Sequence, residues 1–132
     1  MTRISVLLAA ALAMAPPATA MAHIVFDNPE ARPNAYYAGA LRVSHGCGDS
    51  PTTAITVIFP AGIDAARPQP KYGWTIEIER EPLAAPVAGE GGAMATERVK
   101  AVTWRGWLAS EHFEEFGLSM RIPQTEGPLY FL

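Results

Sequence analysis

The sequence predicts an all-β domain built as a β-sandwich, and three observations lead to this fold class. Short stretches alternate apolar and polar side chains, which places the apolar residues on one face of a strand. The 12 prolines and 11 glycines indicate many short connections between such stretches. After residue 22 no helical stripe of apolar residues extends beyond two turns. Many short strands with turn residues between them are typical of a sandwich.

Five stretches are expected to be strands because they alternate or are rich in β-branched and aromatic residues: 41–43, 55–59, 74–79, 99–104 and 116–122. The stretch 55–59 is more uniformly apolar than the alternating ones and is followed by Pro60, which predicts a strand buried on both faces. The small and Gly/Pro-rich stretch 83–95 is expected to be a flexible hairpin loop.

The first 22 residues have the organisation of a cleavable signal peptide. Arg3 precedes an apolar run over 4–15, and Pro16-Pro17 and small residues follow. The run is too short to cross a bilayer core, which takes roughly 20 residues in a helix. We therefore expect a signal peptide over 1–22 and one domain over 23–132. The product is expected to be periplasmic or extracellular, with no membrane span in the mature chain.

Charge and cysteine content narrow the function further. The formal net charge is −3 and no run of Lys or Arg occurs, so nucleic acid is not an expected partner. Cys47 is the only cysteine, which in an exported protein indicates a missing partner, an intermolecular bond or a free thiol. The chain ends on the apolar, strand-like string 129–132. We expect that a C-terminal portion with a second cysteine is missing.

Both possible cleavage sites create a copper-competent N-terminus. A cut after Ala22 makes His23 the first residue, whose α-amine and imidazole Nδ1 can chelate one metal ion. A cut after Ala20 leaves His23 third, a spacing that encloses Cu(II) or Ni(II) in a square plane of nitrogens. Losing the amine proton at neutral pH costs only about 1 kcal/mol, since the reference pKa is ~7.7–8.0. Nitrogen donors suit Cu(II), which heads the divalent affinity series.

The chain resembles the YcnI-like family of exported copper-binding domains over essentially all of residues 23–132. Two strings are the most specific: His45-Gly46-Cys47-x-x-Ser50-Pro51-Thr52-Thr53 and Pro68-x-Pro70-Lys71-x-Gly73-Trp74. Further matching segments are 23–26, 41–44, 58–63, 96–97, 102–104, 115–117 and 127–131.

The resemblance implies an Ig-like or cupredoxin-like β-sandwich that carries Cu(II) at its processed N-terminus. It implies a single-histidine brace made by the amine and imidazole of His23, with Glu97 as the carboxylate ligand and Trp104 close to the metal. Such a brace also favours cleavage after Ala22.

The sequence departs from the family in three ways that bear on structure. Gly106-Trp107 stands where members commonly have Gly-Gly, and the stretch 88–95 is richer in glycine and poorer in charge. Members also continue past the last strand to a cysteine that the resemblance pairs with Cys47. Removing a native disulfide from a small secreted domain typically costs about 2–5 kcal/mol.

Other polar residues have simpler interpretations. We expect His45 to shape a turn that enters the cysteine strand, and His112 to lie on a solvated acidic loop. Asp27 and Glu30 are further candidate carboxylates for the brace, and Asp27 is within reach if the chain doubles back. No nucleophile elbow or phosphate-binding glycine loop occurs.

The sequence therefore predicts a non-enzymatic copper-binding module for copper buffering, acquisition or delivery. Its expected partners are the copper ion and other exported or membrane copper-handling proteins. Two alternatives stay open: a copper-dependent oxidative enzyme, for which His45 or His112 would be the second histidine, and a metal-free secreted structural sandwich.

Overall fold

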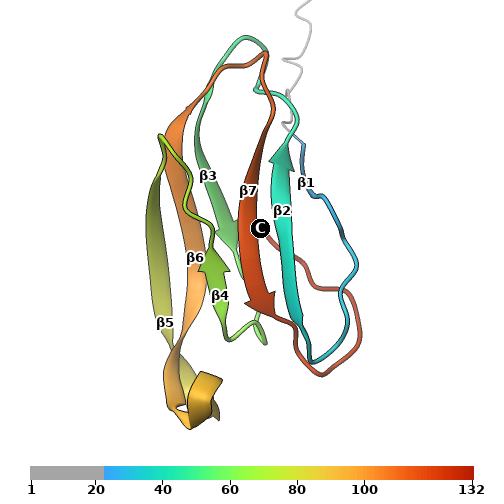
Figure 1. Ribbon diagram of the computed structural model, residues 1–132, viewed down its shortest axis with the longest axis vertical. Helices are drawn as coiled ribbons and strands as arrows, with labels where there is room; N and C mark the ends of the chain where they lie inside the picture. The colour runs from blue at the N-terminus through green and yellow to red at the C-terminus, as the bar shows by residue number, and fades with distance from the viewer. Residues whose placement is uncertain (1–22) are drawn as a thin grey trace, which may run out of the picture.

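The structure, a computed structural model, describes residues 23–132 and shows two facing antiparallel β-sheets (Figure 1). The signal peptide expected over 1–22 lies outside the described residues. The first sheet has the order β1-β2-β7-β4, with bounds Ile24–Phe26, Tyr36–Val43, Glu114–Arg121 and Ala66–Pro68. The second has the order β3-β6-β5, with bounds Thr52–Ile58, Met94–Leu108 and Thr75–Ala88. The all-β sandwich expected from the sequence is confirmed.

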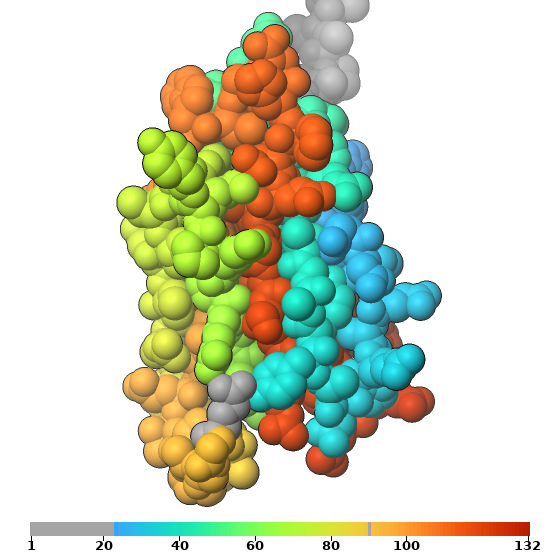
Figure 2. Space-filling view, viewed as in Figure 1, coloured from blue at the N-terminus to red at the C-terminus, as the bar shows by residue number. Residues whose placement is uncertain are grey.

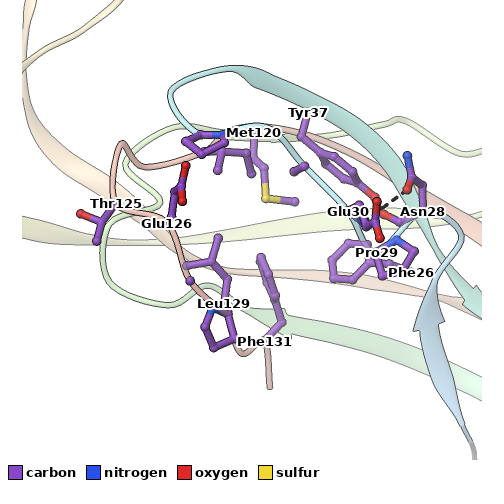
Figure 3. A pocket seen from close by; sticks show the side chains of 15 residues that line it. Phe26, Asn28, Pro29, Glu30, Tyr37, Met120, Thr125, Glu126, Leu129 and Phe131 are labelled. Carbon is purple, nitrogen blue, oxygen red and sulfur yellow. Dashed lines mark hydrogen bonds between the residues drawn. The ribbon is translucent and has the colours of Figure 1, made fainter.

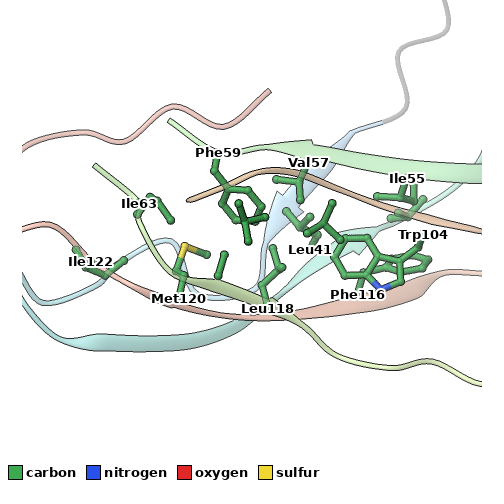
Figure 4. Packing of buried hydrophobic residues seen from close by; sticks show 14 of the residues in the cluster. Leu41, Ile55, Val57, Phe59, Ile63, Trp104, Phe116, Leu118, Met120 and Ile122 are labelled. Carbon is green, nitrogen blue, oxygen red and sulfur yellow. The ribbon is translucent and has the colours of Figure 1, made fainter. Parts of the chain in front are cut away.

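The core lies between the two sheets, where alternate residues of each strand point inward (Figure 4). On β7, Phe116, Leu118 and Met120 are buried, as the alternation predicts. The most deeply buried large side chains come from both sheets and the loops between them: Trp104, Phe59, Phe116, Ile63, Met120, Val43 and Val102. Full burial of one such aliphatic or aromatic side chain contributes roughly 1.5–3 kcal/mol. Within residues 23–132, no helix is long and apolar enough to span a membrane.

Two local expectations are corrected. In β3, Ile55 and Val57 are buried, whereas Thr56 and Ile58 are exposed, so this strand is buried on one face only. The reason is that β3 belongs to a sheet whose outer face is open to solvent. The stretch 83–95 consists mainly of strand, because β5 and β6 pair again after an irregularity between Pro82 and Val87, out to Ala88 opposite Met94.

The loop in that stretch is confined to a tight turn around a single 3-10 turn, η1 (Glu90–Gly92). The amide of Gly89 donates to the carbonyl of Ala93 over 2.8 Å and closes the turn. Gly91 and Gly92 have φ of 70° and 80°, a conformation that favours glycine. The glycines therefore set the turn, while their neighbours extend the hairpin.

The C-terminal segment closes the side of the sandwich between β1 and β3. Ile58 and Leu132 exchange two backbone hydrogen bonds of 2.8 and 3.3 Å, so the segment runs along the edge of β3. The ring of Phe131 lies between those of Phe26 and Phe59, with centroids 5.0 and 6.0 Å away. The apolar string at the end of the chain is thus used in packing.

Candidate metal centre

His23 is exposed and directly precedes the edge strand β1. The register pairs Ile24 with Val43, so His23 lies beside the point where β2 ends. In Figure 1 this is the end of the sandwich at which β2 ends and β7 begins. An exposed residue at a strand terminus is accessible to a metal ion in solution and to another protein.

All three histidines of the chain lie at this end. His45 belongs to the loop that follows β2, and His112 belongs to the turn that precedes β7. These two segments touch, because a Cβ at Gly46 would lie 3.3 Å from the Cα of Ser110. Both histidines are exposed. The fold places at one end three histidines that are far apart along the chain.

The two loop histidines also have local contacts. The Nδ1 atom of His45 is 2.9 Å from its neighbouring carbonyl at Gly46, which fits the expected turn. The Nε2 atom of His112 is 3.9 Å from the carboxylate of Glu111, consistent with the acidic loop expected there. Among residues 23–132, no three His, Cys, Asp or Glu side chains are grouped closely enough to hold a metal ion. A site at this end would therefore rely on the two nitrogens of a processed His23.

Glu97 lies towards the other end of the molecule. It is exposed on β6, opposite Pro82 of β5, near the η1 turn (Figure 1). Seven residues of extended strand separate Glu97 from Trp104, which corresponds to about 23 Å. The structure does not bring Glu97 together with Trp104 or with His23.

Trp104 is a core residue. It has no exposed surface, and its ring centroid lies 5.5 Å from that of Phe116 in the opposite sheet. Its indole Nε1–H donates to the carbonyl of Gln69 over 3.3 Å, which satisfies its one polar group. The side chain therefore links the two sheets from within.

Asp27 is committed to backbone contacts. Its Oδ1 accepts hydrogen bonds of 2.8 Å from the amides of Ala40 and Asn28. The Ala40 amide is the main cause that lowers the pKa of this carboxyl. Because β1 is extended, the chain does not double back, and Asp27 lies about 13 Å along the strand direction from His23. Glu30 lies further along, in the connection to β2.

The sequence did not indicate two ion pairs that flank the start of β7. Lys71 Nζ lies 2.8 Å from a Glu114 oxygen and 5.5 Å from the centre of the Phe116 ring. Partial burial opposes ionisation of Glu114, but Lys71 and the Glu115 amide together lower its pKa. Arg42 binds Glu115 through two nitrogens at 2.7 and 2.9 Å. Lys71 belongs to the family string Pro68-x-Pro70-Lys71, and this string was the feature of the sequence that could have pointed to Lys71.

Comparison with known proteins agrees with this architecture. A similar solved structure is that of an uncharacterized protein from Nocardia farcinica with an immunoglobulin-like fold; the TM-score is 0.57 and the identity 26%, over 79% of this chain and 70% of that chain. No curated protein matches the chain. The model of a family described as a domain of unknown function, DUF1775, matches residues 23–132. The chain therefore belongs to the DUF1775 family, which is the YcnI-type family.

Proposed function

We propose that this chain is an exported copper-binding module that holds Cu(II) at its processed N-terminus. The observation that carries the proposal is the position of His23. It is exposed, it stands directly before the first strand, and the family match starts at this residue. A leader-like segment precedes it, so cleavage after Ala22 would give an N-terminal histidine.

Cleavage changes the chemistry of this residue. In the uncut chain the nitrogen of His23 is an amide and is a poor metal donor at neutral pH. After cleavage it is an amine with a reference pKa of about 7.7–8.0, and together with the imidazole it forms a chelate. Imidazole and amine nitrogens match the preference of Cu(II), which has the highest affinity in the divalent series. Export and metal binding are thus linked in one proteolytic step.

The surroundings support a role in copper exchange. The carboxylates level with the start of β1, Glu114 and Glu115, are already engaged by Lys71 and Arg42. With two nitrogens from one exposed residue, the site would leave coordination positions open to solvent or to a donor or acceptor protein. An open site of this kind fits buffering, acquisition or delivery, with other exported or membrane copper-handling proteins as partners.

The test compares two forms of residues 23–132 released from a carrier, one beginning at His23 and one with a single glycine before it. We expect one Cu(II) per chain in the first form, measured by intact mass and electron paramagnetic resonance. The glycine-extended form should lose that signal or show a different one, because the terminal amine has moved. Circular dichroism checks that both forms are folded. Equal affinity and identical spectra of the two forms would contradict the proposal.

Single substitutions provide matched controls. His23→Ala should abolish the Cu(II) signal, whereas His112→Ala should leave it unchanged, because both residues are exposed but only one carries the amine. If His112→Ala removes binding as completely as His23→Ala, the site is a multi-histidine site. If no form takes up copper, the chain is a metal-free structural sandwich.

A copper-dependent oxidative enzyme is the second candidate, because His45 and His112 lie at the same end as His23. A second histidine ligand would make the site suitable for redox chemistry on oxygen. Copper-loaded protein with ascorbate should then form hydrogen peroxide faster than free copper does, and His45→Ala or His112→Ala should reduce that rate. We expect no such turnover from a binding module.

A further inference from the structure

A cavity of about 590 Å³ lies between the connection from β1 to β2 and the C-terminal segment (Figure 3). Figure 2 shows these two segments, blue to cyan and red, together at the lower right. They are joined by a hydrogen bond of 3.1 Å from the Asn34 amide to the Pro123 carbonyl. The volume is within the roughly 300–1,000 Å³ range of small-molecule sites. The cavity is on the half of the sandwich away from His23.

The walls of this cavity are aromatic and fixed in place. Phe26 packs edge-on against Tyr37 and Phe131, with centroids 6.0 and 5.0 Å away and interplanar angles of 84° and 69°. The phenol of Tyr37 donates a hydrogen bond to the Asn28 carbonyl. Met120, buried on β7, lines the same cavity. A ligand would therefore meet a preformed surface that is largely apolar and aromatic.

The charged residues of the cavity have one sign. Glu30 and Glu126 both line it and are exposed, and Figure 3 shows Glu30 beside Asn28 and Glu126 on the opposite side. Among the residues that the structure describes, no Lys or Arg lines the cavity, and Arg32 of the same connection is not among the lining residues. Within residues 23–132, neither glutamate pairs with a Lys or Arg, whereas five others do: Glu77, Glu79, Glu81, Glu114 and Glu115.

We propose that this cavity binds a small organic cation with an apolar or aromatic body and an ammonium group. The rings and Met120 would cover the body, and the ammonium group would face the carboxylate of Glu30 or that of Glu126 across the cavity. This site is separate from the copper site, and each can exist without the other.

The test uses three probes with the same body and different charge: phenethylammonium, 2-phenylethanol and phenylacetate. Binding to the purified protein is measured by calorimetry and by the NMR shift of the Met120 methyl group. We expect the cation to bind at least about fivefold more tightly than the alcohol, because one or two part-exposed charge contacts typically increase affinity by about that factor. The anion should bind more weakly than the alcohol.

The variant Glu30→Gln/Glu126→Gln removes the charge without changing the cavity walls. The ratio of cation to alcohol affinity should fall to near one, while the affinity for the alcohol stays the same. Glu97→Gln is the matched control, since it removes an exposed carboxylate elsewhere and should leave the ratio unchanged. The proposal is overturned if the cation and the alcohol bind equally, if the double variant keeps the preference, or if no probe shifts Met120 at millimolar concentration.

Discussion

Replacing Glu97 with glutamine tests whether the ligand set implied by family resemblance applies to this chain. Glu97 is about 23 Å along β6 from Trp104. Trp104 contacts Phe116. Phe116 pairs with Leu41 of β2, and Leu41 pairs with Phe26 of β1. His23 lies three residues before Phe26, on the side away from Glu97. The separation of Glu97 from His23 therefore exceeds about 23 Å.

That separation determines the expected effect on copper affinity. At about 23 Å in water, one unit charge changes the energy of the doubly charged Cu(II) by roughly 0.4 kcal/mol, or about twofold in affinity. Physiological salt reduces this further, since the Debye length is about 8 Å. Loss of a direct ligand would instead exceed the ~10–100-fold effect typical of residues that only support the ligands.

The assay is a competition titration of Cu(II) between a chelating dye and the form that begins at His23. We expect Glu97→Gln to keep the Cu(II) dissociation constant at physiological salt within about 1.5-fold of the parent, because screening reduces the charge effect. His23→Ala serves as the positive control for loss. If Glu97→Gln weakens binding tenfold or more while circular dichroism is unchanged, the register-based separation is refuted and Glu97 is a ligand.

Three further predictions concern stability and are checked by urea unfolding. Arg98 donates to backbone carbonyls at 3.0–3.4 Å and its side chain is 12% exposed, so Arg98→Lys should lower the free energy of unfolding by about 2 kcal/mol. The control is Arg105→Lys, where the side chain is 56% exposed and the free energy of unfolding should change by less than about 0.5 kcal/mol. Gly106→Ala should cost about 1–3 kcal/mol, because its Cβ would lie 2.3 Å from the Trp74 ring; no loss would mean that the ring moves freely. The lowered pKa of Glu114 means that its carboxylate stabilises the fold at pH values above the ordinary pKa of 4.5. This contribution disappears as the pH falls through the lowered pKa, so Glu114→Gln should make the free energy of unfolding less dependent on pH in acid.

The strands could be predicted from the sequence wherever one face alone is buried. Phe116, Leu118 and Met120 alternate with less buried residues, and the same period appears in the fold. The prediction was wrong at Ile58, because an apolar residue on an open sheet face looks the same in the sequence as a buried one. It was also wrong over 83–95, where small residues and prolines suggested a loop although long-range pairing with β6 extends the strand.

The candidate site was less predictable because it depends on contacts between distant segments. That His45 and His112 lie at the same end as His23 follows from the sheet order, which one sequence does not reveal. The departure at Gly106-Trp107 also has a structural explanation. Trp74 packs on Gly106 and needs the glycine, whereas Trp107 is 69% exposed, so the second position accepts a large side chain.

The second family string, residues 68–74, serves the fold. The carbonyl of Gln69 accepts the Trp104 indole, Lys71 pairs with Glu114, and Trp74 packs edge-on against Phe116 at 4.8 Å. These residues join the β4–β5 connection to the core, and Lys71 reaches Glu114, which is level with the start of β1.

The His-Gly-Cys string is structural in the same sense. The Ser50 amide donates to the Cys47 carbonyl, and Gly46 is buried where a Cβ would lie 2.3 Å from the Ser50 carbonyl oxygen. The strings that identify the family therefore maintain a sandwich that presents its N-terminus. His23 itself makes no core contact, so a relative without it would keep the fold and lose the proposed chelate. His23→Ala should then unfold at the same urea concentration as the parent in the absence of copper, and a large loss of stability would mean that His23 also has a structural role.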